Sequence, residues 1–254
     1  MLEVRGLCRN FGGLPALNAV SFRAAVGAVT ALIGPNGAGK STLINCTTGV
    51  DRPDAGEVLL GGRAITGLPA HRVAGLGVTR TFQNLRLFPR LSVLDNVLCG
   101  LTVQAGHSLL GALLRPPALR DRERRLRLTA LAALDRFGLT ALADWPVAAL
   151  AYGDRKRVEL ARAVVSEPRL LLLDEPVAGL NATETAAVGA EIRRLRTRGY
   201  TVLLVEHDMD LVMSIADRVV VLDSGRCIAQ GTPFEVRRNP LVLEAYLGQT
   251  SLVA

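Results

Sequence analysis

An eight-residue segment near the start of the chain combines glycines, a lysine and a hydroxyl side chain at a spacing that suits phosphate binding. Gly34–Ser41 matches the pattern G-x-x-x-x-G-K-[ST] at every fixed position. Its glycines let backbone N–H groups curl around phosphate oxygens, and a helix starting near Lys40 adds positive potential. Lys40 is predicted to reach the β- and γ-phosphates, and the Ser41 hydroxyl to coordinate Mg²⁺. The predicted phosphate-binding residues are Gly34, Pro35, Asn36, Gly37, Ala38, Gly39, Lys40, Ser41 and Thr42.

The amino-acid composition makes the lysine of this segment informative. Of the 30 lysine and arginine residues among the 254, only Lys40 and Lys156 are lysine. The net charge of +7 therefore reflects an arginine bias over the whole surface. The densest basic run, Arg120–Arg127, is interleaved with acidic residues and lacks the aromatic residues on which single-stranded nucleic acids stack. We therefore expect no nucleic-acid partner.

Two carboxylates follow a strongly apolar run in the second half of the chain. Leu170–Leu173 is four consecutive leucines, which is typical of a strand buried on both faces of a parallel sheet. Asp174, at the carboxyl end of this strand, is predicted to join the Mg²⁺ shell beside Gly34–Ser41. Glu175 is predicted to polarise the attacking water.

A histidine follows a third apolar run, Thr201–Val205. We predict that His207 ends this strand, as Asp174 ends the previous one, so that both lie on the ligand edge of the sheet. A lone histidine is more often structural than functional, but at this edge an imidazole can hydrogen-bond a γ-phosphate and the attacking water. Glu175 and His207 are therefore the predicted catalytic residues.

The elements that must position these residues read as an α/β fold. Short β-rich runs and crossover helices, together with Gly34–Ser41, predict a core that binds a nucleoside triphosphate at about residues 1–90 and 167–231; the family resemblance described below implies that this is the ATP-binding core. A helical insertion is predicted at about 91–166, and a helical tail at about 232–254. The helices expected in these parts are Leu91–Gly106, Pro117–Gly138, Leu150–Val165, Pro233–Arg238 and Leu241–Leu247. The segment 106–117 is expected to be a loop whose leucines are core rather than a membrane-facing surface.

The lengths of the apolar runs and the spacing of the cysteines limit the possible classes of protein. No apolar run is long enough to span a bilayer and the N-terminus lacks the apolar region of a signal peptide, so a cytoplasmic location is expected. Four scattered cysteines predict reduced thiols.

In their order along the chain, these motifs resemble those of the ATP-binding subunits of ABC transporters. Gly34–Ser41 and Asp174–Glu175 resemble the Walker motifs, Gln83 in RTFQN the glutamine loop, and His207 the switch histidine. Phe11 matches the aromatic residue that stacks on adenine. The place of the ABC signature is taken by Leu150, Ala151, Tyr152, Gly153 and Asp154.

The resemblance implies a fold, two cofactors and a partner. The fold is a P-loop NTPase (ABC ATPase) core with a mixed sheet, an N-terminal antiparallel β subdomain and an inserted α-helical subdomain. The cofactors are ATP and Mg²⁺, with Ser41, Gln83 and Asp174 at the metal. Two such ATPases pair head to tail, so Gly153 and the following helix face the partner's ATP. The partner is a second ABC ATPase subunit, with a hetero-pair favoured over self-pairing.

Longer stretches narrow the resemblance to the LivG type. FGGLPAL, LAYGDRKRVELARA and EHDMDLVM resemble one of the paired ATPases of branched-chain (hydrophobic) amino-acid importers. This implies two membrane permease subunits and, indirectly, a periplasmic or extracellular solute-binding protein. The chain is then expected at the cytoplasmic face of the cell membrane. Exposed apolar residues around Gln83 are expected to meet the coupling helix of a permease.

Three residues depart from the common pattern of this family. Ala151 replaces the signature serine, Asp154 replaces a glutamine, and Asn181 replaces the aspartate of the D-loop. These departures put in doubt the ATP site opposite this chain's signature, while Glu175 and His207 are intact.

Other functions remain as alternatives at this stage. Within transport these are a urea or amide importer and a lipopolysaccharide exporter. A soluble ATP-driven switch in DNA repair or translation would require paired domains or coiled-coil insertions that 254 residues do not hold. A small-molecule kinase would have no reason for LAYGD ahead of the Asp174 strand.

Overall fold

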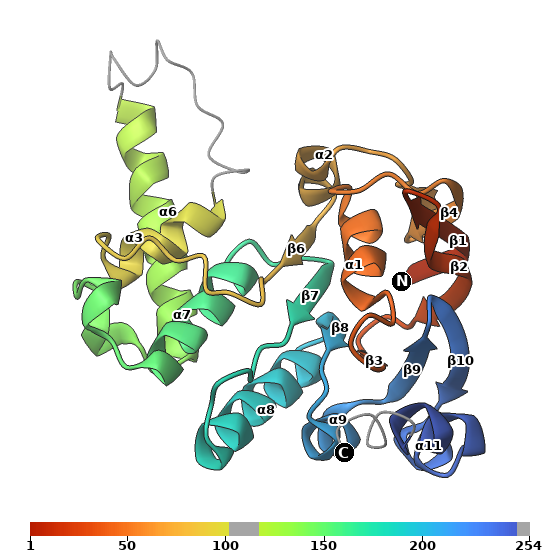
Figure 1. The fold of residues 1–254 in the computed structure, drawn as a ribbon. Helices are drawn as coiled ribbons and strands as arrows, with labels where there is room; N and C mark the ends of the chain where they lie inside the picture. Colours follow the sequence, from red (N-terminus) through yellow and green to blue (C-terminus); the bar gives the residue numbers. More distant parts are fainter. Residues whose placement is uncertain (102–116, 248–254) are drawn as a thin grey trace.

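The computed structural model describes residues 1–101 and 117–247, whose strands form two sheets. Figure 1 shows the N-terminal sheet on one side of the molecule, a group of helices on the other, and the main sheet between them. Most of the predicted loop at 106–117 lies outside the described residues. Within the described ranges, no helix is long and apolar enough to cross a membrane.

The N-terminal sheet is antiparallel and has the strand order β2-β1-β4-β5. Its strands are β1 (Leu2–Phe11), β2 (Leu14–Ala24), β4 (Ala55–Leu60) and β5 (Arg63–Ala64). Along β2 buried and exposed side chains alternate, as expected for a sheet with one face in water. The buried face packs on α1 (Lys40–Thr48) and one face of the main sheet.

The main sheet has the order β10-β9-β3-β8-β7-β6 and is mixed, because β10 runs antiparallel to β9 while the other pairs are parallel. Its strands are β3 (Val29–Ile33), β6 (Val78–Arg80), β7 (Leu170–Asp174), β8 (Thr201–Val205), β9 (Arg218–Asp223) and β10 (Arg226–Gly231). Every residue of β3, β7 and β8 is buried, which confirms that the leucine run is a central strand. The predicted mixed sheet and N-terminal antiparallel sheet are thus confirmed.

Helices cover both faces of the main sheet. On the core they are α1, α2 (Ala70–Gly75), α8 (Ala182–Thr197), α9 (Met209–Ile215), α10 (Pro233–Arg237) and α11 (Pro240–Leu247). The two helices expected near the C-terminus therefore exist. Val236 and Val242 of this tail pack against β3 and β9.

The inserted helices lie beside the sheet edge formed by β6 and β7 (Figure 1). They are α3 (Val93–Leu98), η1 (Cys99–Leu101), α6 (Pro117–Arg136), η2 (Thr140–Leu142), η3 (Val147–Ala149) and α7 (Tyr152–Val164). The helix expected over Leu91–Gly106 exists in its described part, but it begins at Val93 and its α-helical part ends at Leu98. The Ser92 hydroxyl caps α3 by accepting from the Asp95 N–H, and a 3₁₀ turn follows Leu98. The division into core, insertion and tail stays a prediction.

Candidate nucleotide-binding and hydrolysis site

The phosphate-binding loop lies at the carboxyl end of β3, where two glycines allow close approach to neighbouring backbone. Gly34 has φ 147°, and a Cβ there would lie 2.0 Å from the Leu222 carbonyl oxygen. Gly39 has φ 98°, and a Cβ there would lie 2.4 Å from the Ala16 carbonyl oxygen. Any larger residue at either position would displace backbone, so both glycines are structurally required. The loop therefore has the tight turn that the sequence pattern predicts.

Lys40 is the first residue of α1 and its side chain folds back over the loop. Its ammonium donates to the carbonyl oxygens of Gly34 at 2.6 Å and Pro35 at 2.8 Å. Burial lowers the pKa of Lys40, while the nearby Glu175 and Asp174 raise it. Within the described residues, the N–H groups of Gly37, Gly39, Lys40 and Ser41 donate to no acceptor. A cation and several backbone donors thus converge at the amino end of a helix, which suits a phosphate.

The two predicted carboxylates lie at the carboxyl end of β7. Asp174 pairs in register with Val205 of the adjacent β8, and the Glu175 N–H donates to the Val205 carbonyl at 2.9 Å. Glu175 has φ 49°, a left-handed conformation that is uncommon for a residue other than glycine. This turn carries the Glu175 carboxylate away from the strand, and strained backbone of this kind is frequent at functional sites.

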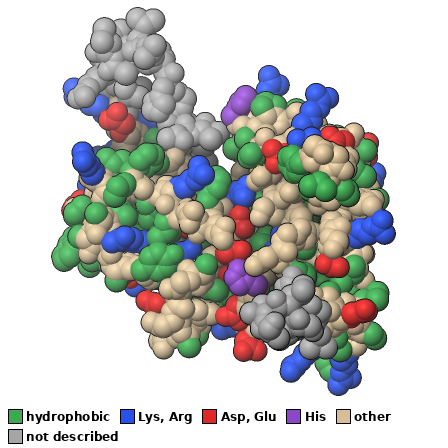
Figure 2. Space-filling model, in the orientation of Figure 1, with side chains coloured by type: hydrophobic (Ala, Val, Ile, Leu, Met, Phe, Trp, Pro, Cys, Tyr) green, Lys and Arg blue, Asp and Glu red, His purple; other side chains and the backbone are tan. Residues whose placement is uncertain are grey.

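Glu175 is contacted by both of the other residues predicted around it. Gln83 Nε2 donates to Glu175 Oε2 at 2.8 Å, and His207 Nδ1 lies 3.5 Å from Glu175 Oε1. Figure 2 shows acidic side chains and a histidine gathered in the middle of this face, between the inserted helices and the sheets. Gln83, predicted as a metal ligand, makes its side-chain contact to Glu175 in this structure. The structure thus brings residues of two distant motifs to one carboxylate.

The prediction that His207 ends a strand was wrong, because β8 ends two residues earlier, at Val205. The intervening Glu206 is 1% exposed. Its carboxylate accepts from the N–H groups of Val177 at 3.1 Å and His207 at 3.2 Å. His207 then lies on a loop with its side chain 52% exposed. Because His207 lies on a loop and not in the strand, its side chain is less restricted and can extend toward a nucleotide bound at this edge of the sheet.

Arg80 at the end of β6 is a site residue that sequence reasoning missed. Its Nη2 donates to Asp174 Oδ2 at 2.8 Å, and its Nη1 donates to Asn45 Oδ1 of α1 at 2.8 Å. The metal-binding carboxylate predicted from the sequence therefore already has a cationic partner. The only available signal was its position, at the end of a strand three residues before Gln83.

A second missed cation lies under the first turns of α7. Lys156, the other lysine of the chain, is 2% exposed, and its ammonium lies 3.5 Å from the Glu175 carbonyl oxygen. Burial lowers its pKa, while Glu159, Glu206 and Glu175 raise it. Burial also raises the pKa of the Glu206 carboxyl. Both lysines of this arginine-rich chain are thus buried beside the Glu175 turn.

The segment LAYGD at the start of α7 packs on the D-loop of its own chain. The Tyr152 hydroxyl donates to the Ala178 carbonyl at 3.3 Å, and a Cβ on Gly153 would lie 2.9 Å from Glu184 Oε1. A cavity of about 320 Å³ lies between Ala151 and α8, and none of its lining residues belongs to the phosphate-binding loop. Within the described residues, no hydrogen bond or ion pair joins LAYGD to the phosphate-binding loop.

Two of the unusual residues have structural partners that the sequence reasoning did not anticipate. Asp154 pairs with Arg157 one helical turn later. Asn181 caps α8, because its side chain accepts from the Glu184 N–H at 3.0 Å and its N–H donates to the Glu184 carboxylate at 3.0 Å. The spacing N-x-x-E is that of a capping box, which was the available signal.

Ala151→Ser is expected to raise the free energy of unfolding by about 1 kcal/mol, because Ala151 is the N-cap residue of α7 and has no side chain that can accept a hydrogen bond. A serine hydroxyl can cap the first turn, and in a head-to-tail pair it can instead donate to the partner's γ-phosphate. Urea unfolding and ATP-dependent association with the partner subunit measure the two effects. Ala149→Ser is the control, because Ala149 is exposed at the end of η3 and lies outside α7 and its N-cap. A stability gain without tighter association would contradict a role in the pair.

Phe11 lies at the tip of the β1–β2 hairpin, beside the phosphate-binding loop. The hairpin is placed there by the close contact of Ala16 with Gly39, and the Phe11 side chain is exposed with the Arg9 guanidinium 4.6 Å from its ring centre. Its predicted stacking on adenine fits this position and stays a prediction.

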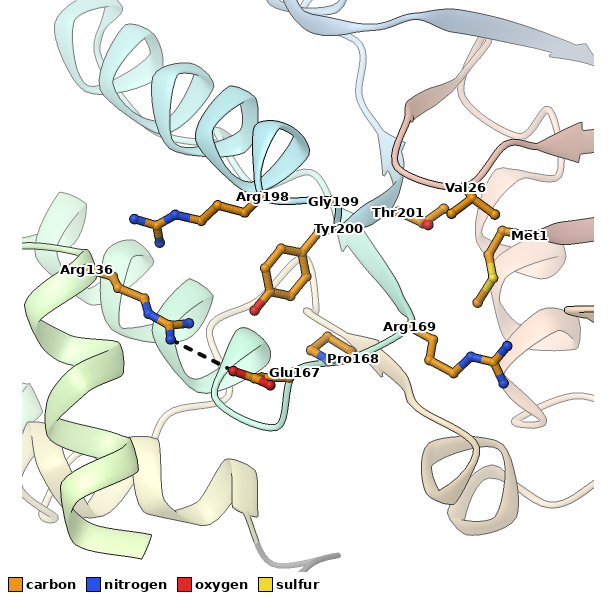
Figure 3. A pocket seen from close by; sticks show the side chains of 10 residues that line it. All are labelled: Met1, Val26, Arg136, Glu167, Pro168, Arg169, Arg198, Gly199, Tyr200 and Thr201. Atoms are coloured by element: carbon orange, nitrogen blue, oxygen red, sulfur yellow. Dashed lines mark ion pairs between the residues drawn. The ribbon is translucent and has the colours of Figure 1, made fainter. Parts of the chain in front are cut away.

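A cavity of about 630 Å³ lies at the opposite end of the main sheet from the phosphate-binding loop and Glu175 (Figure 3). It is formed by the loops that lead into β7 and β8, where Tyr200 points into it and Arg136 faces Glu167 at 3.9 Å. No predicted site residue lines it. The candidate site is therefore the edge formed by the phosphate-binding loop and the end of β7.

Comparison with family models agrees with this geometry. The ABC transporter model matches residues 17–178, which contain the phosphate-binding loop, Gln83, the LAYGD segment and Glu175. A second model, described as branched-chain amino acid ATP-binding cassette transporter, matches residues 226–250.

Individual proteins resemble the chain over almost its whole length. It is 46% identical over 250 residues to the high-affinity branched-chain amino acid transport ATP-binding protein BraF of Pseudomonas aeruginosa, and 44% identical over 250 residues to LivG of Escherichia coli K12; 98% of each chain is covered in both cases. The crystal structure of an ABC transporter cassette in its ADP conformation matches with a TM-score of 0.85 at 32% identity, covering 98% of each chain. The chain therefore belongs to the ATP-binding proteins of ABC transporters, in the branched-chain amino acid group that contains LivG and BraF.

Proposed function

We propose that this ABC transporter ATPase powers the import of branched-chain or other hydrophobic amino acids. The observation that carries the hydrolytic part is the pair of contacts on Glu175, from Gln83 at 2.8 Å and His207 at 3.5 Å, beside Lys40. The solute class is supported by relatives whose names state branched-chain amino acid transport.

The roles of the site residues follow from their positions. Lys40 and the N–H groups of α1 bind the β- and γ-phosphates. Glu175 takes a proton from the attacking water, and Gln83 orients its carboxylate. His207, exposed on its loop, hydrogen-bonds the γ-phosphate. Each of these assignments is part of the proposal.

The residues at this edge fit a Mg²⁺ ion bound together with nucleotide phosphates. Ser41 is exposed in the first turn of α1, and Asp174 Oδ1 makes no hydrogen bond to the described residues, whereas Oδ2 is held by Arg80. Hydroxyl and carboxylate oxygens suit Mg²⁺, which usually binds one or two carboxylates plus phosphates. In residues 1–101 and 117–247 no group of three His, Cys, Asp or Glu side chains is arranged for a metal. Ser41 and Asp174 would therefore hold the ion with the phosphates, whose negative charge it neutralises.

The proposed ATP sites are composite, with two ATPase subunits paired head to tail. Within the described residues, the Gly153 N–H donates to no acceptor, and the cavity beside it is lined by no residue of the phosphate-binding loop, which leaves the amino end of α7 to a phosphate held by a partner. The departures Ala151 and Asp154 support a partner of different sequence, because a hetero-pair has only one site opposite this signature. Pairing with a second copy is the alternative arrangement.

The proposed permease contact lies between the core and the inserted helices. Two adjoining cavities of about 400 and 440 Å³ share lining residues at the end of β6 and in η1. Phe88, 52% exposed, and Leu91 lie in the same region of the chain and present apolar surface. The coupling helix of one membrane permease would bind here, which would hold the chain at the cytoplasmic face of the membrane.

Reconstitution tests the function and its solute class together. The chain is assembled in lipid nanodiscs with two membrane subunits, a paired ATPase and the solute-binding protein from the same genome. Leucine, isoleucine or valine is expected to raise the ATPase rate severalfold, because solute-loaded binding protein favours closure of the ATPase pair. Stimulation by urea or lipopolysaccharide and not by leucine would contradict amino-acid import. The Glu175→Gln complex controls for contaminating ATPases.

A further inference from the structure

Arg80 lies between the predicted metal-binding carboxylate and the segment that carries Gln83. We propose that Arg80 is a positioning residue for Asp174: it holds Oδ2, so that Oδ1 is available to Mg²⁺ bound with ATP, and it ties the metal site to the Gln83 segment. This inference rests on the proposed function, because it assigns a role within the same site.

The guanidinium of Arg80 is fixed between two elements. One terminal nitrogen is bonded to Asp174 Oδ2 of β7 and the other to Asn45 Oδ1 of α1, both at 2.8 Å. The side chains of Arg80 and Asp174 are only 13% and 9% exposed. Because the guanidinium is planar, two simultaneous contacts determine its orientation as well as its position. Arg80 therefore restricts the rotation of the Asp174 carboxylate.

The remaining polar atom of Arg80 shows that these contacts dominate its conformation. Its Nε is buried without a hydrogen-bond partner in the described residues, and a buried unpaired donor is unfavourable. The guanidinium also lies 5.1 Å from the ring centre of Phe82. The side chain thus keeps the conformation that forms hydrogen bonds to Asp174 and Asn45, although this conformation leaves Nε without a partner.

Three residues of the segment Arg80–Gln83 bind Asp174 or Glu175 at the end of β7. Arg80 holds the Asp174 side chain, and the Thr81 hydroxyl accepts from the Asp174 N–H at 3.2 Å. Gln83 holds the Glu175 carboxylate at 2.8 Å. A displacement of this segment would therefore move the metal ligand and the proposed base together. Arg80 supplies the metal half of this connection.

A carboxylate that binds a metal is commonly oriented by a hydrogen bond to its other oxygen, and loss of such a partner typically lowers metal affinity or activity about 10- to 100-fold. The opposite expectation would hold if Arg80 only competed with the metal for Asp174. Removal of the cation would then strengthen Mg²⁺ binding. The two roles of Arg80 therefore predict changes of opposite sign.

The experiment measures ATP affinity of the full chain with excess Mg²⁺ and with EDTA, for the native protein and for Arg80→Met. The readout is the Mg²⁺ enhancement, defined as the ratio of the two Kd values. We expect Arg80→Met to lower this enhancement about tenfold and to change the EDTA affinity less. Arg80→Lys keeps the charge but not the fixed fork, so its enhancement is expected to lie between the two.

Arg86→Met is the matched control, because Arg86 also lies over the Phe82 ring, at 4.4 Å, and forms no ion pair in the described residues. It is expected to keep the native enhancement. An unchanged or larger enhancement in Arg80→Met would overturn the inference. If Arg80→Met does not fold, judged by its circular dichroism, a native enhancement in Arg80→Lys overturns it instead. Failure of the native chain to bind ATP would contradict the proposed function itself.

Discussion

Glu175→Gln is expected to lower kcat for ATP hydrolysis by about 10²- to 10⁴-fold, the usual contribution of a general base. The amide cannot take a proton from water, whereas it has nearly the same shape and its oxygen can still accept from Gln83 Nε2. The Kd for ATP is expected to stay within about threefold of the native value, because Lys40 and the helix terminus are unchanged. Single-turnover hydrolysis and equilibrium ATP binding, measured on the reconstituted complex, separate the two effects.

Glu167→Gln is the matched control for this substitution. Glu167 precedes β7, whereas Glu175 follows it, so the same chemical change is made at the opposite end of one strand. The control is expected to hydrolyse ATP at the native rate. If Glu175→Gln also hydrolysed ATP at the native rate, Glu175 could not be the base. The substituted complex should in addition keep its ATP-bound ATPase pair closed for longer, which cross-linking across the pair can follow.

Lys40→Ala is expected to weaken ATP binding by at least about 10²-fold. Each hydrogen bond from a charged group contributes about 1.5–3 kcal/mol, and Lys40 is placed to reach two phosphates. The measurement is the Kd for ATP, with the unfolding midpoint in the absence of nucleotide as the test of folding. Native affinity in a folded Lys40→Ala chain would contradict the assignment.

Lys40→Arg separates the charge of Lys40 from its shape. The ammonium is buried against two carbonyl oxygens at 2.6 and 2.8 Å, so a planar guanidinium should not fit, and ATP binding should be weak although the charge is kept.

The affinity of the native chain for ATP is expected to decrease as the pH rises through the pKa of Lys40. Burial lowers the pKa of Lys40, and only the protonated amine attracts phosphate. ATP affinity should therefore fall at a less alkaline pH than an ordinary lysine would give.

Features encoded within one short segment could be predicted from the sequence. The spacing of Gly34, Gly39 and Lys40 determined the loop, because both glycines adopt a positive φ that other residues disfavour and the helix begins directly after Gly39. The leucine run before Asp174 predicted a central strand, because a strand covered on both faces buries consecutive apolar side chains and the run is too short for a typical helix. The fold class and the family followed from such segments taken in order.

Contacts between segments distant in the chain were decided by the tertiary structure. Arg80 reaches Asp174 across 94 positions because β6 and β7 are neighbours in the sheet, and one arginine among so many carries no local sign of that contact. Lys156 reaches the Glu175 turn only because α7 packs across the end of β7. His207 lies outside the strand because the buried Glu206 carboxylate accepts from two backbone N–H groups. Local spacing determines backbone shape, whereas the partner of a charged side chain is set by which elements the packed core brings together.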